Sequence, residues 1–230
     1  MSDLSATVAD LIAVLENHKN PEKALQMSAY MKYQFPFLGL QNQERKKLSK
    51  AFIQEIKKGC PSPPFEILNI LWELPEREYQ YIAMDLLDKY LQDLTLNDIS
   101  SVIRFIIHKS WWDSVDLLAS HAVGTILSSY PAQQEQYVQS WTTTENIWLS
   151  RTALLFQLSY KENTNWPLLQ HTCLSLKDSE EFFIQKAIGW GLRQYSKVNA
   201  EAVVQFTENH KWKPLSKREG QKWLIKAGYL

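Results

Sequence analysis

Residues 146–158 read NIWLSRTALLFQL, and this stretch indicates most clearly how the chain folds. Its apolar side chains recur at helical spacing as two stripes rather than one. The first stripe comprises Ile147, Leu154, Leu155 and Leu158, and the second comprises Leu149, Ala153 and Phe156. A helix with two apolar faces packs against neighbours on more than one side. The stretch therefore predicts a helix inside a layered, helical architecture.

Helix signals recur along the chain, whereas hairpin signals are missing. The sequence has no Asn-Gly, Asp-Gly or Gly-Gly pair and no long period-two alternation bounded by turns. Caps or prolines mark helix starts at Asn20-Pro21-Glu22, Leu74-Pro75-Glu76, Tyr130-Pro131, Asp178…Glu181 and Ser216…Glu219. The last two resemble capping boxes. We therefore predict an all-α protein of about a dozen helices, each of about 10–17 residues.

A faint repeat suggests how these helices stack. Trp112, Trp148 and Phe183 each open a predicted helix, at spacings of 36 and 35 residues. Each is followed within a turn by a polar residue, namely Asp116, Arg151 or Lys186. Helix pairs at such a period build an α-solenoid, because each pair buries its apolar face on the next. We predict HEAT-like repeats that form a curved superhelix with a concave surface. Residues 57–64 form the longest breaker-rich link, but similar helices flank it, so we predict one domain over residues 1–230.

The composition excludes several classes of protein. The 230 residues are 45% hydrophobic and 22% charged, which is typical of a soluble globular protein and not of a disordered or fibrous one. No apolar run approaches the ~20 residues of a membrane span, and the N-terminus lacks the features of a signal peptide. Cys60 and Cys173 make neither a disulfide framework nor a zinc site, and the histidines show no metal spacing. We expect a cytoplasmic, nucleoid-associated protein of bacterial type without a metal or another cofactor.

Charge is balanced overall but unevenly distributed. The chain has 25 basic and 25 acidic side chains. Residues 1–60 carry 9 basic and 6 acidic side chains, and residues 191–230 carry 8 and 3. The stretches 61–110 and 111–190 each carry 4 basic and 8 acidic side chains. Two basic ends of a curved molecule can grip a polyanion while carboxylates between them do chemistry. A solvated mixture of charges explains the same counts.

Two predicted helices carry an aromatic and a charged residue on one face. Trp112 and Asp116 are four residues apart, and Trp190 and Arg193 are three apart. Stacking at one repeat spacing would bring both pairs and Arg151 onto a common surface. A carboxylate beside tryptophans is not easily explained by a core, because buried carboxylates need partners. The mixture suits a nucleic-acid surface where arginine holds phosphate, tryptophan meets sugar or base, and aspartate faces developing positive charge.

Other aromatic residues have a simpler interpretation. Core packing accounts for one of Trp111 and Trp112, and it also explains Trp72, Trp148 and Tyr30 on composition alone.

Several long strings of residues resemble the AlkD family of DNA alkylation repair enzymes, over about residues 20–218. These strings are Tyr30-Met31-Lys32, Phe37-Leu38-Gly39, Leu74-Pro75-Glu76-Arg77-Glu78, residues 109–116 (KSWWDSVD), Asn146-Ile147-Trp148-Leu149 with Arg151, residues 182–190 (FFIQKAIGW), and Pro214-Leu215-Ser216-Lys217-Arg218-Glu219. Chance agreement across all of them is implausible.

This resemblance implies a HEAT-repeat-like DNA glycosylase that hydrolyses the N-glycosidic bond of N3- or N7-alkylated purines in duplex DNA. The family's catalytic carboxylate falls on Asp116, and its two lesion-site tryptophans fall on Trp112 and Trp190. Its phosphate-gripping arginines fall on Arg151 and Arg193. No conspicuous lysine nucleophile accompanies Asp116, so we predict a monofunctional enzyme without lyase activity.

Further DNA contacts are predicted at Lys186, Tyr30, Lys32, Lys217 and Arg218, the last two at a helix N-terminus where free N–H groups favour phosphate. We expect a monomer acting on double-stranded DNA, with no membrane partner. Two alternatives stay open: a non-catalytic α-solenoid that binds nucleic acid or protein, and a sensor of damaged or branched DNA that does not cleave it. Asp116 favours the enzyme, because a scaffold has no need of a carboxylate between two tryptophans.

Overall fold

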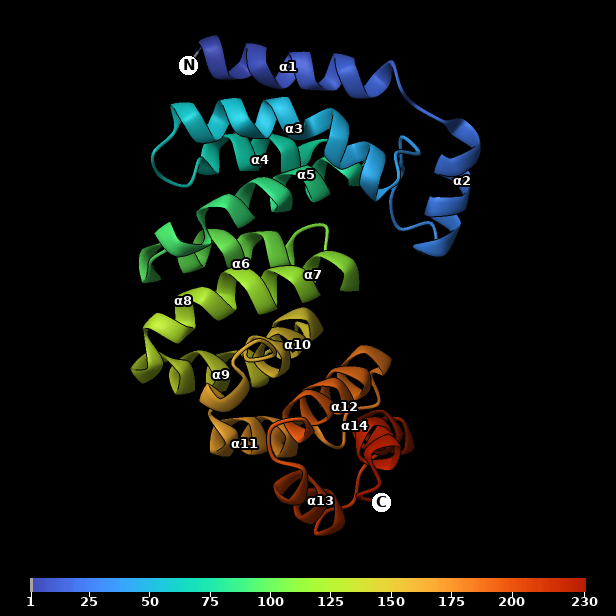
Figure 1. Ribbon diagram of the computed structural model, residues 1–230, viewed down its shortest axis with the longest axis vertical. Helices are drawn as coiled ribbons and strands as arrows, with labels where there is room; N and C mark the ends of the chain where they lie inside the picture. The colour runs from blue at the N-terminus through green and yellow to red at the C-terminus, as the bar shows by residue number, and fades with distance from the viewer. Residues whose placement is uncertain (1) are drawn as a thin grey trace. The chain divides into compact units, whose positions relative to one another are not determined.

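The protein is helical throughout its described part. A computed structural model describes the backbone of residues 2–230 and the side chains of residues 7–230, and these contain helices but no strand. They divide into two compact units, Met1–Leu94 and Thr95–Leu230. The all-α prediction is therefore confirmed (Figure 1). The division lies at residue 94, not at the link over residues 57–64, and the single domain stays a prediction.

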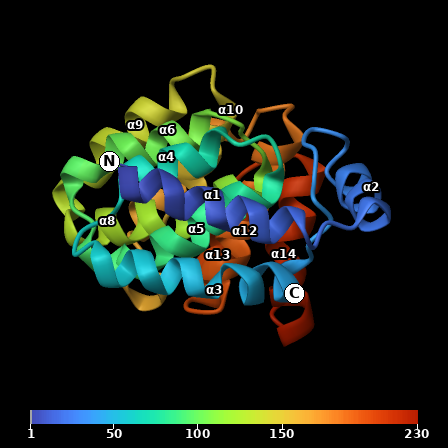
Figure 2. The same cartoon turned by 90° about the horizontal axis from the view of Figure 1, so that it is seen from above.

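The first unit contains five α-helices and a 3₁₀ segment. These are α1 (Ser2–Glu16), α2 (Pro21–Tyr30), α3 (Asn42–Gly59), α4 (Phe65–Glu73), α5 (Arg77–Leu87) and η1 (Asp88–Asp93). α1 packs on α3 and α4, and α5 packs on α3 and α4. α2 lies beside this stack and buries none of its residues (Figures 1 and 2). The loop after α2 is exposed at residues 32–34 and becomes buried at residues 37–40.

A buried carboxylate closes that loop onto the stack. Glu78 of α5 accepts hydrogen bonds from the backbone N–H groups of Leu38, Gly39 and Leu40, at 2.9–3.0 Å. Gly39 has φ +91°, and a Cβ there would lie 2.1 Å from the carbonyl oxygen of Asn20. Only glycine fits this position without strain. The Phe37-Leu38-Gly39 string is thus a structural loop tied down by Glu78.

The second unit continues the helical succession. Its elements are η2 (Leu96–Asp98), α6 (Ile99–Ile107), α7 (Trp112–Leu118), the π-helix η3 (Ala119–Val123), α8 (Gly124–Ser129), η4 (Pro131–Gln133), α9 (Gln134–Thr142), α10 (Ile147–Leu155), η5 (Lys161–Asn163), α11 (Trp166–Leu176), α12 (Phe182–Ser196), α13 (Ala200–Glu208) and α14 (Pro214–Ala227). Each helix packs mainly on close neighbours in sequence, as expected of a solenoid. α10 is buried on most of its circumference, as its two apolar stripes predict.

Among the described residues, α12 and α14 share the most extensive contact between two helices. A Cβ on Gly189 of α12 would lie 2.4 Å from Cβ of Glu219 and 2.9 Å from the carbonyl oxygen of Ser216. The hydroxyl of Ser216 donates to the carbonyl oxygen of Gln185 on the facing helix, at 3.1 Å. The absence of a side chain at Gly189 lets α14 lie directly on α12. This contact fixes where Glu219 points.

Several predicted helix starts are confirmed. Asn20 caps α2 by accepting a hydrogen bond from the N–H of Lys23, with Pro21 at the first helical position. Asn146 caps α10 in the same manner, and Pro131 opens η4. Trp112 opens α7, and Trp148 and Phe183 are the second residues of α10 and α12. The spacings of 36 and 35 residues therefore mark equivalent positions, at the starts of α7, α10 and α12.

Both predicted capping boxes are wrong. Glu181, not Asp178, is the N-cap residue of α12, and it makes no side-chain cap. Pro214 starts α14 two residues before Ser216, so Ser216 lies inside the helix and bonds to α12 instead. Several helices are also shorter than the expected 10–17 residues, and α3 is longer, with 18. For α7 and α8 the reason is the π-helix η3, which divides the run from Trp112 to Ser129. No helix in the described part of the chain is long and apolar enough to cross a membrane.

Candidate active site

The candidate site begins at the entry to α7. The chain turns at Lys109, whose φ is +51°, and Trp111 precedes the helix in an extended conformation. This places Trp112 at the first helical position and Asp116 one turn later. The π-helix η3 follows directly, and the hydroxyl of Ser120 donates to the carbonyl oxygen of Asp116 at 2.7 Å. π-helical turns within α-helices occur frequently at functional sites.

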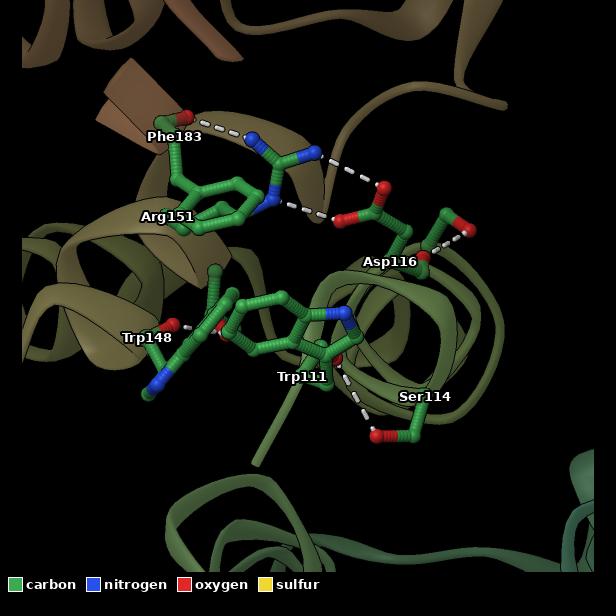
Figure 3. Close-up of polar contacts among 8 residues, drawn as sticks. Trp111, Ser114, Asp116, Trp148, Arg151 and Phe183 are labelled. Carbon is green, nitrogen blue, oxygen red and sulfur yellow. Dashed lines mark hydrogen bonds and ion pairs between the residues drawn. The ribbon is translucent and has the colours of Figure 1, made fainter. Parts of the chain in front are cut away.

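Arg151 of α10 grips the carboxylate of Asp116 with two parallel hydrogen bonds. Nε of Arg151 lies 2.6 Å from Oδ1 of Asp116, and Nη2 lies 2.8 Å from Oδ2 (Figure 3). Nη1 of the same guanidinium donates to the carbonyl oxygen of Phe183 at the start of α12. Only 5% of the Arg151 side chain and 14% of the Asp116 side chain are exposed. One arginine therefore joins three helices and fixes the direction of the carboxylate.

An aromatic cluster supports this pair. The ring of Trp111 lies 5.8 Å from that of Trp148 and 5.2 Å from that of Phe183, and the last two are 5.0 Å apart. The guanidinium of Arg151 lies 5.9 Å from the Phe183 ring, on the same side of the cluster as Asp116 (Figure 3). Trp111 and Trp148 are thus packing residues, as expected for one of the Trp111–Trp112 pair. The cluster holds α7, α10 and α12 in register around Arg151.

A cavity of about 370 Å³ opens beside the ion pair. Its walls come from α7, α10, α12 and α14, all within the second unit. The lining residues are Trp112, Asp116, Arg151, Phe182, Phe183, Lys186, Trp190, Arg193 and Glu219. The structure thus brings together all five residues that the resemblance singled out for catalysis and phosphate binding, along with Lys186.

Three lining residues were not predicted as site residues. Phe182 and Phe183 stand in the FFIQKAIGW string, and the exposure of 56% of Phe182 beside the cavity marks it as a surface aromatic. Glu219 matches the last position of a predicted capping box, which gives its side chain a local role at the helix start. No sequence signal reveals its role, because that role depends on how closely α14 approaches α12.

Glu219 is surrounded by cations at the rim of the cavity. Oε1 of Glu219 lies 2.6 Å from Nζ of Lys222 and 3.3 Å from Nζ of Lys186. Its Oε2 lies 3.0 Å from Nη1 of Arg193. The Glu219 side chain is only 6% exposed, whereas the three cations keep 28–50% exposure. The buried carboxylate therefore lies at the centre of three cationic side chains that are partly exposed to solvent.

The two carboxylates of the cavity differ in acidity. Burial raises the pKa of Asp116, and Asp113 adds to this, while the hydrogen bonds and charge of Arg151 act in the opposite direction. Burial also acts to raise the pKa of Glu219, but Lys222 and Lys186 outweigh it and lower that pKa to about 2. Glu219 is therefore ionised at any physiological pH.

The other predicted DNA contacts lie outside the cavity. Lys217 and Arg218 are exposed on α14. They do not lie at free N–H groups as predicted, because the helix starts at Pro214 and the N–H of Lys217 already donates to the carbonyl oxygen of Lys213 at 3.1 Å. Tyr30 ends α2 in the first unit and is 69% exposed, so core packing does not explain it. Lys32 follows in the exposed loop with φ +56°. Contacts of these four side chains with DNA stay predictions. Among the described residues, no group of His, Cys, Asp and Glu is arranged to hold a metal ion.

The fold and the cavity define an all-helical repeat protein that holds an acid–arginine pair between tryptophans. Comparison with known proteins then identifies its family. A model of the DNA alkylation repair enzyme family matches residues 11–224, so the chain belongs to that family. It is also similar to a solved structure described as a predicted DNA alkylation repair enzyme from Enterococcus faecalis, with 39% sequence identity and a TM-score of 0.83. The match covers 90% of this chain and 97% of that one. A search of curated proteins found no match.

Family membership gives the protein a role in the repair of alkylated DNA, as a member of a family of enzymes, and implies that it binds DNA.

Proposed function

We propose that the protein is a monofunctional, AlkD-type DNA glycosylase that hydrolyses the N-glycosidic bond of positively charged N3- or N7-alkylated purines in duplex DNA. One observation carries this proposal: a carboxylate held in a fixed direction by Arg151 lies in a cavity lined by Trp112 and Trp190. The cavity thus presents a carboxylate and two tryptophan side chains to the same part of a substrate.

The chemistry needs little more than this carboxylate. A cationic alkylpurine is a good leaving group, and the sugar becomes oxocarbenium-like as the bond breaks. Asp116 stabilises that charge and orients the attacking water, while its hydrogen bonds to Arg151 hold it in place beforehand. Each carboxylate oxygen accepts one hydrogen bond from Arg151 and retains further acceptor capacity. Trp112 and Trp190 contribute about 0.5–2 kcal/mol per contact to a cationic base or an oxocarbenium-like sugar.

Arg151 acts in this proposal chiefly on Asp116. Its guanidinium is nearly buried and donates to Asp116 and to Phe183, so positioning the carboxylate is its main task. The phosphate contact predicted for Arg151 stays a prediction. Arg193 is more exposed, which suits a contact with the DNA backbone.

The expected absence of lyase activity concerns Lys186, which is a predicted DNA contact and lines the cavity together with Asp116. Its Nζ, however, lies 3.3 Å from Oε1 of Glu219. The amine must leave this ion pair before it can attack the sugar and form a Schiff base. We therefore expect hydrolysis without strand cleavage, and no covalent adduct on treatment with borohydride.

The direct test is release of free base from a duplex that carries a single 7-methylguanine. Replacement of Asp116 by Asn is expected to slow release by ~10²–10³-fold, because one charge-stabilising group is lost. Asp113→Asn is the matched control: it removes a neighbouring carboxylate of the same helix and is expected to leave release nearly unchanged. Binding of the duplex should persist in both variants.

The other outcomes separate the alternatives. If the wild-type protein binds lesion DNA but releases no base, it is a non-catalytic solenoid or a damage sensor. If wild type and Asp116→Asn release base equally, the glycosylase stands and Asp116 is not its catalytic residue.

A further inference from the structure

The cation cluster at the cavity rim has an electrostatic arrangement that DNA binding alone does not explain. Lys186, Arg193 and Lys222 all contact the single carboxylate of Glu219. A surface made only to attract phosphate would have no acid in its centre, because the acid cancels one positive charge. The cluster still carries a net charge of about +2, given that Lys and Arg are charged at neutral pH.

Glu219 controls the direction of these cations. Lysine and arginine side chains lose considerable rotamer entropy when they are fixed, so isolated surface cations sample many positions. Each cation of the cluster contacts Glu219 through one nitrogen and keeps part of its surface towards solvent. Contact with Glu219 therefore orders these side chains before DNA binds, so phosphate binding loses less conformational entropy.

The position of the Glu219 carboxylate follows from the close packing of α12 and α14, which Gly189 allows. Gly189 lies one residue before Trp190, and its missing side chain leaves the space that Cβ of Glu219 occupies. Lys186 and Arg193 lie one turn before and one turn after Gly189 on α12, whereas Lys222 lies one turn after Glu219 on α14. Close approach of the two helices thus brings cations from both onto one anion.

We propose that Glu219 is a positioning residue for DNA binding, which arranges Lys186, Arg193 and Lys222 into one binding site for a backbone phosphodiester next to the cavity. The inference rests on the proposed function, because the cavity must receive a nucleotide of duplex DNA for the rim to meet its phosphate. It adds Glu219 and Lys222 to the functional residues. The low pKa of Glu219, about 2, agrees with this arrangement, since the carboxylate is charged at neutral pH together with the three cations.

This proposal makes a prediction opposite to that of simple charge counting. Glu219→Gln removes a negative charge from a DNA-binding rim, and by charge alone it should tighten binding. If Glu219 positions the cations, the same change instead weakens binding, by about tenfold at moderate salt, and flattens the dependence of log K on log salt.

The experiment measures binding of an undamaged fluorescent duplex over a range of salt concentrations. The first comparison is Glu219→Gln against Glu208→Gln, which removes an exposed acid on α13 outside the cluster. Weaker binding by the first variant only supports the proposal, and unchanged or tighter binding by Glu219→Gln overturns it. Thermal unfolding of both variants checks that the fold is retained.

A second pair keeps the proposal testable if Glu219→Gln does not fold. Lys222→Gln is expected to reduce the salt slope by about 1, the value for one phosphate contact, while Lys226→Gln, one turn further along α14, is not. Equal slopes for the two variants would overturn the proposal. Where Glu219→Gln does fold, the cost of Lys222→Gln should largely disappear in the double variant, because the two residues act as a unit.

These measurements are independent of catalysis. They use undamaged DNA, so a wild-type protein that releases no base can still lose binding on Glu219→Gln. In that case the proposed glycosylase fails and the phosphate site stands. If the wild type releases base and Glu219→Gln binds DNA as tightly as the wild type, the proposed glycosylase stands and the phosphate site fails.

Discussion

Glu78 of the first unit and Asp116 of the second are both buried carboxylates, but different groups satisfy them. Glu78 accepts three hydrogen bonds from the backbone of a single loop. Asp116 receives its hydrogen bonds from a side chain, that of Arg151, and lines a cavity. Burial raises the pKa of both. Burial and a shifted pKa are therefore insufficient to mark a catalytic acid, and the cavity is what distinguishes the two.

Glu78 and Asp116 also differ in role, the first in the fold and the second at the cavity. Hydrogen bonds from backbone groups leave Glu78 no free direction towards solvent, because its side chain is fully buried. Asp116 is bound on one side only and partly exposed. We infer that Glu78 holds the loop at Gly39 in place and that Asp116 holds charge for the substrate.

The largest expected effect is on the stability of the first unit. Glu78→Ala leaves three buried N–H groups without an acceptor, each of which costs about 1–3 kcal/mol. We expect the free energy of unfolding to fall by about 3–5 kcal/mol, in urea titrations followed by circular dichroism. Asp116→Asn keeps one of the two acceptors of Arg151 and leaves one donor unsatisfied, which should cost about 1–3 kcal/mol. If the two variants lose equal stability, the division of roles between the carboxylates is wrong.

In the second unit, the sequence predicts where helices start better than it predicts the contacts between helices. Spacing alone predicts that Trp112 and Asp116 share one face, and it predicts helix starts at Trp112, Trp148 and Phe183, each within one residue of the observed start. It succeeds because helical period and capping are local properties. Asp116, Arg151 and Trp190 were brought to one surface by the repeat spacing, and the structure bears this out.

What the sequence did not reveal depends on distances between helices. The pairing of Arg151 with Asp116 requires α7 and α10 to lie within reach of an arginine side chain. The cluster around Glu219 requires the close contact at Gly189, which no local pattern reports. For the same reason, Ser216 and Glu219 matched a capping box by spacing although both face α12. Local signals cannot distinguish a cap from a tertiary contact.

A smaller effect is expected from a change that keeps the charge opposite Asp116. Arg151→Lys retains a cation but loses the paired hydrogen bonds and the contact with Phe183, because lysine offers a single nitrogen. We expect base release to slow by about tenfold, corresponding to about 1.4 kcal/mol in the activation free energy. The measurement is single-turnover release of 7-methylguanine.

Arg104→Lys makes the same chemical change at an exposed position of α6 and should leave release unaltered. Full activity of Arg151→Lys would show that the direction of Asp116 is immaterial and that charge alone suffices.

The smallest effect concerns pH, and it separates activity from stability. Asp116 acts as a carboxylate, and its pKa lies above the ordinary 3.8, so base release should decline on acidification earlier than for an exposed aspartate. Because the folded-state pKa is raised, protonation of Asp116 does not itself destabilise the fold. Glu219 behaves oppositely: its pKa falls from 4.5 to about 2 on folding, so its contribution to stability is complete above pH 4.5 and is lost as the pH falls towards 2. We therefore expect base release, corrected for release without protein, to fall at a higher pH than the circular dichroism signal of the fold. Coincidence of the two curves would mean that acid inactivates the protein by unfolding it and that the titration of Asp116 is not what limits catalysis.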